Sequence, residues 1–578
     1  MAQRRTERLR QANLVDYEQE YKSFNWEDVE RFLGLEGDGW NIAEVALNRH
    51  GVDQEAKTAF RFDYGTGLTS ISYGQLQDLT NKFAGLIRSL GVPQGGRVAV
   101  YLPMQPEFYI SFLGTVKAGV IVIPMSPVFM SDAVTEILRD SEATLVVTTW
   151  RLLARIAWRE LPSLEQIILV DEQEPPRAEV QPSVGGGQIV RYAEAMKAAD
   201  SKYVAPKLGK ESPMMLLYTS GSTGKPKGVL HVHGGLTQFY QTGKWVLDLQ
   251  PDDIYWCTSE PSWIPGISYG IWAPLLHGVT SVIYCGEFRP EIWYGVLSKN
   301  YVTLWYTTPT SLRKLMNFGP ANPAKRNNLS ALRHVLTVGE PLNPGVIRWG
   351  GEALGLQICD TYWMTETGGQ LIANFRTVPV KPGSMGKPIP GIEAGIVNER
   401  GKELPAWEVG QLAIKAGWPA MMRGIWKDEA KFREYFGQEP WYLTGDLAYR
   451  DTDGYYWFQG RVDDVIKKAS ERIGPFEIES KLVGHPAVLE AGVIGKPDAL
   501  LGEIIKAFIV LRPGYEWGNE LQADIQRFIE ERLGPHMVPR EIEPRAVLPR
   551  TRNGKILRRV LKAQEMGLPY SDVYTPED

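Results

Sequence analysis

The sequence predicts an α/β protein with a large N-terminal domain of mostly parallel sheets and a small α+β domain at the C-terminus. Two observations favour this fold class. From residue 97 onward, short apolar runs typical of strands alternate with helix-like segments, and such alternation indicates βαβ units. The chain also has 578 residues, too many for one hydrophobic core, so about two to four domains are expected.

The expected elements follow one another in a regular order. Residues 21–53 are rich in aromatic and charged side chains, and we expect them to form helices over the main body. The elements expected next are strand 98–102, helix 107–117, strand 120–125, helix 132–139, strand 144–149, strand 166–170, a proline- and glycine-rich loop at 175–187, and strands 214–217, 281–284 and 304–306. Strands separated by crossover helices run parallel in one sheet.

Composition changes near residue 461, and a small unit follows. We expect strands at 491–494 and 507–511 and a helix at 520–533. One face of that helix is apolar, which suits packing on a small sheet; its residues are Leu521, Ile525, Phe528, Ile529 and Leu533. Placing the boundary at Asp463 gives two domains, residues 1–462 and 463–578.

Charge, cysteine and hydropathy patterns narrow the partners and the compartment. The formal net charge is −5 and the pI about 6.0, so nucleic acid is not an expected partner. The three cysteines are far apart and lack metal-ligand spacing, which favours a reduced, cytoplasmic setting. The N-terminal residues lack the apolar core of a secretory signal. The most apolar stretch, 118–129, is too short for a membrane span.

The stretch 218–231, YTSGSTGKPKGVLH, has the composition of a phosphate-binding loop. Glycines let backbone N–H groups approach an anion closely, and the hydroxyls and Lys225 add donors and charge. In a Walker loop the lysine is followed by Ser or Thr opening a helix, whereas Pro226 follows Lys225 and residues 229–230 are typical of a returning strand. A flexible glycine–serine turn is the remaining structural alternative.

Further motifs follow along the chain: VGEP at 338–341, DTYWMTETGG at 360–369, TGD at 444–446, GRVDDVI at 460–466 and PRTRNGKILRR at 549–559. With the loop, they resemble the AMP-forming acyl-CoA synthetases of the adenylate-forming ANL superfamily, which includes luciferases and peptide-synthetase adenylation domains. The resemblance spans roughly residues 21–562 and is strongest to the acetyl-CoA synthetase branch. It implies a ligase that uses ATP, Mg²⁺ and coenzyme A to convert a short carboxylate, acetate first and propionate next, into acyl-AMP and then acyl-CoA.

The resemblance also implies roles for individual residues. Lys555, Thr219 and Glu366 are the expected catalytic residues, with Glu366 as the metal ligand, because Mg²⁺ prefers one or two carboxylates together with phosphate oxygens. Tyr362 would stack on the base, and Asp446 would accept hydrogen bonds from the ribose. The residues expected to bind ATP or AMP are Thr219, Ser220, Gly221, Ser222, Thr223, Gly224, Lys225, Gly339, Glu340, Pro341, Asp360, Thr361, Tyr362, Trp363, Met364, Thr365, Asp446, Arg461 and Arg472.

The C-terminal domain is expected to be mobile about a hinge at Asp463. In the resembling family, rotation withdraws the catalytic lysine, here Lys555, and opens a tunnel for CoA. Ser470 stands at the tunnel wall where most relatives carry glycine, while Arg472 is retained, so CoA binding is the step this departure puts in question. Lys555 is also a candidate target for a lysine acetyltransferase and deacetylase.

Acyl-chain length is expected to depend on Trp363, which closes the carboxylate pocket in similar enzymes. An ordinary buried core tryptophan is the alternative. Ile264, Pro265 and Val338 are the other expected pocket residues, and Ile264 and Pro265 replace a Val–Thr pair of the nearest branch, which leaves the acyl specificity open. A pocket discriminates one methylene by about 1–3 kcal/mol, so acetate over propionate would be a preference.

Two other functions are weighed against this one. An adenylate-forming enzyme that does not use CoA, or a synthetase for another short or medium acid, would share most of these motifs. The pattern Gly-x-Ser-x-Gly at 266–270, with His485 or His536 further on, resembles a serine-hydrolase nucleophile elbow. No apolar strand leads into it, so a hydrolase is disfavoured.

Overall fold

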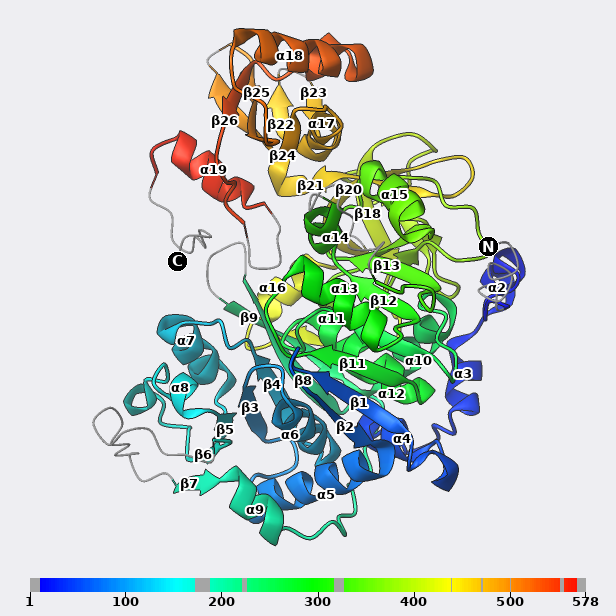
Figure 1. Cartoon of the computed structure of the whole chain (residues 1–578), viewed down its shortest axis with the longest axis vertical. Coiled ribbons are helices and arrows are strands. Elements are labelled where there is room, and N and C mark those ends of the chain that lie inside the picture. The colour runs from blue at the N-terminus through cyan, green and yellow to red at the C-terminus, as the bar shows by residue number, and fades with distance from the viewer. Residues whose placement is uncertain are drawn as a thin grey trace.

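The structure, a computed structural model, describes residues 11–171, 188–220, 226–316, 327–437, 439–468, 471–498, 500–550 and 556–568. It is an α/β protein, as predicted. Figure 1 shows a large body of sheets and helices, with a smaller unit formed by the C-terminal elements at its top. Within the described ranges, no helix is long and apolar enough to cross a membrane. The predicted loop at 175–187 lies outside these ranges.

The first large sheet has eight strands in the order β19-β9-β8-β4-β3-β5-β6-β7. Its strands are β3 (Arg97–Tyr101), β4 (Ile121–Met125), β5 (Leu145–Thr148), β6 (Gln166–Leu169), β7 (Gln188–Arg191), β8 (Pro213–Ser220), β9 (Pro226–Val232) and β19 (Gly424–Ile425). The strands from β3 to β8 pair in parallel, which confirms the predicted alternation. Every residue of β4 is buried, as in parallel sheets covered on both faces.

The second large sheet has nine strands in the order β16-β15-β14-β13-β12-β10-β11-β1-β2. They are β1 (Thr58–Asp63), β2 (Leu68–Ser72), β10 (Ile254–Cys257), β11 (Thr280–Tyr284), β12 (Leu304–Thr307), β13 (His334–Val338), β14 (Ile358–Tyr362), β15 (Ile372–Ala373) and β16 (Lys387–Pro388). The strands β12, β13 and β14 are parallel neighbours, so the residues that follow them meet at one edge of the sheet.

Helices cover these sheets and begin with recognisable signals. Ser72 caps α5 in a reciprocal arrangement with Gln75, and α6 opens with Pro106, which suits a first turn. The predicted helices near the N-terminus are α2 to α4. The bounds are α2 (Tyr17–Ser23), α3 (Trp26–Phe32), α4 (Ile42–Asn48), α5 (Tyr73–Ser89), α6 (Pro106–Lys117), α7 (Ser131–Ser141), α8 (Trp150–Leu153), α9 (Tyr192–Ala198), α10 (Leu236–Trp245), α11 (Ile264–Ile267), α12 (Ala273–His277), α13 (Pro290–Lys299), α14 (Pro309–Met316), α15 (Pro344–Trp349), α16 (Glu429–Glu434), α17 (Pro475–Val483), α18 (Asn519–Leu533) and α19 (Arg558–Glu565).

Two smaller sheets complete the molecule. One has four strands, β17 (Ala394–Val397), β18 (Gly410–Lys415), β20 (Trp441–Arg450) and β21 (Tyr456–Arg461). The C-terminal sheet has five strands, β22 (Ile466–Lys468), β23 (Glu471–Ile473), β24 (Val488–Asp498), β25 (Gly502–Leu511) and β26 (Glu541–Pro544). Its core includes Ile525 and Ile529 of α18, which confirms the predicted apolar face of that helix. The short helix η8 (Val462–Asp464) joins β21 to this unit.

Candidate active site

The predicted phosphate loop connects two antiparallel strands at the carboxyl end of β8. β8 ends at Ser220 and β9 begins at Pro226; these residues face each other in the pairing register, as do Thr219 and Lys227. A Walker loop leads from a strand into a helix, whereas this chain returns as a strand, so the exclusion of that motif is confirmed. Thr219 Oγ1 is buried and has no hydrogen-bond partner among the residues that the structure describes.

Glu366, the predicted metal ligand, forms an ion pair with Lys227 of β9. Lys227 Nζ lies 2.6 Å from Glu366 Oε1, and the Tyr435 hydroxyl donates to the same oxygen at 3.3 Å. Burial raises the pKa of the Glu366 carboxyl, but the Lys227 ammonium outweighs burial and holds this pKa below its ordinary value. The carboxylate is therefore ionised beside the end of the phosphate loop.

This donor set fits Mg²⁺ that is bound together with a nucleotide. Mg²⁺ commonly takes one or two carboxylates and completes its shell with phosphate oxygens and water. Across the described ranges there is no cluster of three or more metal-ligating side chains. Among the described residues, Glu366 is therefore a single carboxylate next to the predicted phosphate loop rather than part of a cluster of metal-ligating side chains.

Three predicted nucleotide-binding side chains lie together on β14, β20 and β21. The Tyr362 hydroxyl donates to Asp446 Oδ2 at 2.6 Å, and Arg461 Nε lies 3.4 Å from Asp446 Oδ1. Asp446 and Arg461 are partners in the β20–β21 register. The structure thus brings together Tyr362, Asp446 and Arg461, which are predicted to contact the base, the ribose and the nucleotide, respectively.

Three residues expected to bind ATP or AMP, Gly339, Glu340 and Pro341, directly follow β13. Gly339 has a φ of +93°, a left-handed conformation that glycine adopts without strain. The Glu340 carboxylate is held by Arg313 and by the Thr310 hydroxyl, the latter at 2.8 Å. On the neighbouring strand, Asp360 is buried and accepts a hydrogen bond from Thr337 Oγ1 at 2.8 Å.

Asp360 is a buried carboxyl on β14, and threonine side chains form hydrogen bonds along this strand and in the segment after it. Burial raises the pKa of Asp360 to about 7. Thr361 donates to the Thr337 carbonyl at 2.7 Å. The Met364 N–H donates to Thr367 Oγ1 at 3.0 Å, at the start of the short helix η7 (Thr365–Thr367) that carries Thr365 and Glu366.

Three of the four predicted carboxylate-pocket residues belong to one buried cluster. Trp363 is 7% exposed, and its indole Nε1 donates to the Tyr306 hydroxyl at 3.1 Å. Val338 and Ile264 are buried in the same cluster, while Pro265 is half-buried. Tyr269, in the helical segment after Ile264, meets the Trp363 ring edge-on at 5.0 Å.

The serine of the hydrolase-like pattern is not a nucleophile. Ser268 begins a π-helical segment (Ser268–Trp272), and its hydroxyl donates to the Gly368 carbonyl at 2.7 Å. His485 instead pairs with Asp524 of α18, in the C-terminal unit. A nucleophile elbow places its serine at a sharp turn from strand to helix, and this serine lies inside a helix.

Several predicted residues lie outside the described part of the chain: Gly221, Ser222, Thr223, Gly224, Lys225, Ser470 and Lys555, together with the side chains of Ser220 and Arg472. The hinge residue Asp463 lies in η8. Sequence reasoning missed Lys227, Tyr435 and Tyr306. Lys227 stands within the phosphate motif and could have been considered, whereas no sequence pattern marks Tyr435 or Tyr306.

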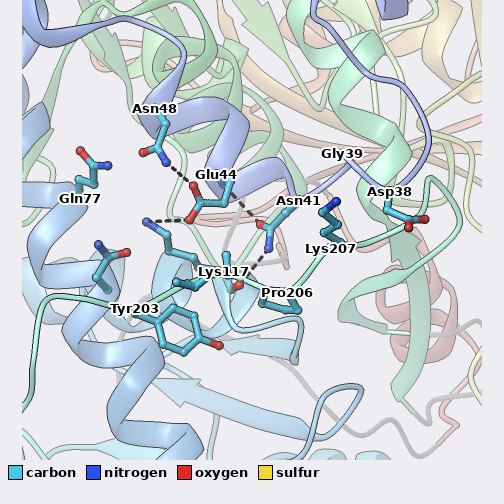
Figure 2. A pocket seen from close by; sticks show the side chains of 13 residues that line it. Asp38, Gly39, Asn41, Glu44, Asn48, Gln77, Lys117, Tyr203, Pro206 and Lys207 are labelled. Atoms are coloured by element: carbon cyan, nitrogen blue, oxygen red, sulfur yellow. Dashed lines mark hydrogen bonds and ion pairs between the residues drawn. The ribbon is translucent and has the colours of Figure 1, made fainter.

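A separate polar pocket of about 360 Å³ lies on the opposite edge of the eight-stranded sheet. Lys117 ends α6 just before β4 begins, whereas the phosphate loop follows the carboxyl end of β8, which is parallel to β4. Figure 2 shows Lys117 directed at Glu44, with its Nζ 3.2 Å from the carboxylate, and Asn41 donating to the Lys117 carbonyl at 2.9 Å. None of the predicted site residues lines this pocket.

Comparisons with known proteins agree with the geometry. Residues 47–426 match the family model of AMP-binding enzymes, and residues 477–555 match the C-terminal domain of these enzymes. The acetyl-coenzyme A synthetase of Bacillus subtilis (strain 168) is 48% identical over 569 residues, covering 98% of each chain. That of Pyrobaculum arsenaticum (strain DSM 13514 / JCM 11321 / PZ6) is 38% identical over 574 residues, covering 93% of this chain and 85% of the relative.

A solved structure supports the same assignment. An anthranilate CoA ligase in complex with anthranoyl-AMP superposes with a TM-score of 0.82 at 28% identity, covering 94% of this chain and 99% of that one. The matches extend over nearly the whole chain and include both the phosphate-loop region and the C-terminal unit. The chain therefore belongs to the family of AMP-binding enzymes, as its motifs predicted, and two of the relatives described above are acetyl-coenzyme A synthetases.

Proposed function

We propose that the protein is an AMP-forming acetate–CoA ligase. The observation that carries this proposal is that the short segment from Tyr362 to Glu366 makes three contacts: the Glu366–Lys227 ion pair, the Tyr362–Asp446 hydrogen bond and the Trp363–Tyr306 hydrogen bond. Two relatives at 48% and 38% identity that are named acetyl-coenzyme A synthetases support the same activity.

In the first half-reaction, a carboxylate oxygen of acetate attacks the α-phosphorus of ATP. The new P–O bond forms while the bond to pyrophosphate breaks, and acetyl-AMP remains. The substrate carboxylate is itself the nucleophile, so the protein supplies positioning and charge neutralisation. Thr219 donates to the phosphates, and Lys555 brings a positive charge to the transferring oxygens. Glu366 would hold Mg²⁺, and the bound ion would neutralise further phosphate charge.

In the second half-reaction, the CoA thiol loses its proton to solvent and the sulfur attacks the acyl carbon, so that a C–S bond forms and AMP leaves with the electrons of the broken C–O bond. The proposed division into residues 1–462 and 463–578 allows the smaller domain to turn at Asp463 and withdraw Lys555. Arg472 and Ser470 then face CoA. Compared with glycine, Ser470 adds a Cβ and a hydroxyl, which makes CoA affinity a quantity to measure.

The acyl group is proposed to be acetyl, with propionyl next. Trp363 limits chain length, and Ile264, Pro265 and Val338 complete the pocket.

The free thiols of Cys257, Cys285 and Cys359 suit the reducing cytoplasm. An acetyltransferase and a deacetylase acting on Lys555 are the proposed regulatory partners.

The experiment that tests the function is pyrophosphate release from MgATP with acetate, propionate, butyrate or hexanoate, each with and without CoA. Highest kcat/KM on acetate, with sustained turnover only when CoA is present, is the expected result. A single burst of pyrophosphate that CoA does not convert into turnover would contradict the ligase and indicate an enzyme that stops at the adenylate. A preference for hexanoate would contradict the short-acid pocket.

A further inference from the structure

Arg558 joins three separate segments of the C-terminal unit through its guanidinium. Its Nε and Nη2 contact the two Glu479 carboxylate oxygens at 2.9 and 2.6 Å, and its Nη1 contacts Asp464 Oδ2 at 2.9 Å. Arg558 opens α19, Glu479 lies on α17, and Asp464 ends the short helix η8 next to the proposed hinge. A bidentate arginine–carboxylate pair fixes both distance and orientation.

Glu479 is a rigid anchor for this arginine. It is 6% exposed, and its Oε1 also accepts the Val493 N–H of β24 at 2.8 Å. The guanidinium is therefore fixed to the body of the small sheet and, through Asp464, to the first residues after the proposed hinge. The far end of α19 is held as well, because Glu565 accepts from Lys506 at 2.6 Å.

The base of the loop that precedes α19 is also pinned. The Leu557 N–H donates to the Pro549 carbonyl at 2.9 Å, and Arg550 and Ile556 form an isolated antiparallel bridge. Arg550 Nη2 lies 2.6 Å from Glu490 Oε2 on β24. The residues at both ends of the loop that contains Lys555 are thus held on the C-terminal sheet. Arg558 also connects the second end of this loop to Asp464, next to the proposed hinge.

We infer that Arg558 is a positioning residue for the adenylation half-reaction, which ties the base of the lysine loop to the hinge-side residue Asp464. The inference rests on the proposed role of Lys555. Arg558 is the third residue after Lys555 in the sequence, so the covalent chain limits the distance between their Cα atoms to about 10 Å. An anchored Arg558 confines the lysine, whereas a released α19 would let the loop drift.

The contact also predicts which half-reaction depends on it. Arg558, Glu479 and Asp464 all follow Asp463, so a rotation at that residue carries them together and leaves their contacts intact. Thioester formation, in which Lys555 is withdrawn, does not use the anchored lysine. Loss of the anchor should therefore slow adenylation and spare the transfer of the acetyl group to CoA.

The test uses the full-length protein and two assays, acetate-dependent exchange of pyrophosphate into ATP and acetyl-CoA formation from supplied acetyl-AMP. The variants are Arg558→Lys, which keeps the charge without the fork, Arg558→Gln, and Asp464→Asn, which leaves the Glu479 pair in place. Arg559→Lys is the matched control, because Arg559 is the next residue of α19 and is exposed. Lys555→Gln serves as the reference for a lost lysine.

We expect Arg558→Gln to lower the exchange kcat by about 10- to 100-fold, since small misplacements of a reacting group cost rates of this order. The exchange kcat of Arg558→Lys and of Asp464→Asn should fall between the values for Arg558→Gln and wild type. In these variants the KM for acetate should stay within about twofold of wild type, and the rate of acetyl-CoA formation from acetyl-AMP within about threefold. Arg559→Lys should match wild type in both assays.

The inference is overturned if Lys555→Gln abolishes exchange while Arg558→Lys and Asp464→Asn exchange like the Arg559→Lys control. It is also overturned if both half-reactions fall together, because that outcome indicates a general structural role. If Arg558→Gln does not fold, Asp464→Asn decides. If Lys555→Gln exchanges pyrophosphate normally, Lys555 has no catalytic role, and the positioning role of Arg558 is overturned with it. That result differs from the first one, in which Lys555→Gln is inactive and only the inference on Arg558 fails.

Discussion

Trp363 is held against Tyr306 by a hydrogen bond from its indole N–H to the tyrosine hydroxyl, 3.1 Å away. Tyr306 lies on β12 and its hydroxyl also meets Thr361 Oγ1 at 2.8 Å, while Tyr269 packs edge-on against the indole. A tryptophan that turned away would separate its buried indole N–H from this partner, which is costly. These contacts hold the Trp363 side chain in one orientation, as the proposed role in limiting acyl-chain length requires.

Replacing Trp363 should change the preferred acid. Trp363→Gly is expected to raise kcat/KM for butyrate relative to acetate by at least about tenfold, because one methylene in a pocket is worth about 1–3 kcal/mol. Tyr306→Phe is the matched variant, since it keeps the ring volume and removes only the hydroxyl. It should give a smaller shift in the same direction. An unchanged butyrate-to-acetate ratio in Trp363→Gly would remove Trp363 from the pocket.

Glu366 should govern the metal dependence of adenylation. Glu366→Gln keeps the size of the side chain and removes its charge, so the exchange kcat should fall about 10²- to 10³-fold, the range for loss of one preorganised electrostatic contact. The Mg²⁺ concentration that gives half-maximal rate should rise. Tyr435→Phe removes a donor to the same oxygen but leaves the carboxylate, and should cost less than about tenfold. Equal Mg²⁺ dependence in Glu366→Gln and wild type would exclude Glu366 as the ligand.

Asp360 should make stability depend on pH. Burial raises the pKa of this carboxyl from 3.8 to about 7, so between these values the folded chain holds a proton that the unfolded chain has lost. Stability due to this group is then greatest below about pH 4 and falls as pH rises towards 7. Asp360→Asn, which cannot titrate, should reduce the loss of unfolding free energy between pH 5 and pH 7 by roughly 1–3 kcal/mol.

The measurement is urea unfolding at several pH values. Asp132→Asn, on the exposed first turn of α7, is the control and should leave the pH dependence as in wild type. A pH profile in Asp360→Asn that matches wild type would show that Asp360 is already ionised in the folded protein at pH 5.

Acetylation of Lys555 should separate the two half-reactions. The modification removes the positive charge, so acetate-dependent pyrophosphate exchange should be lost, whereas acetyl-CoA formation from supplied acetyl-AMP should persist. The protein would be prepared with acetyl-lysine at this position alone, and deacetylation should restore exchange. Normal exchange by the acetylated protein would show that another group supplies the charge.

The fold class and most elements of the larger body could be predicted because their signals are local. The strands predicted at 98–102 and 120–125 agree with β3 and β4 to within one residue at either end. They could be located because continuous apolar runs bounded by glycine and polar residues mark a buried parallel strand. The same holds for the helix at 520–533, whose apolar face follows the helical period. Loop residues carry no such period, and the site could be approached only through motifs.

By itself, the sequence determined the α/β class, the order of the elements and the motifs that mark this family, because each depends on residues close together in the chain. Only the tertiary structure decided which distant side chains meet. Tyr306 and Trp363 are 57 residues apart, Lys227 and Glu366 are 139 apart, and Glu479 and Arg558 are 79 apart. Such pairs form because parallel strands bring their ends to one edge of a sheet and because a buried charge must find its counter-charge, and neither condition leaves a local pattern in the sequence.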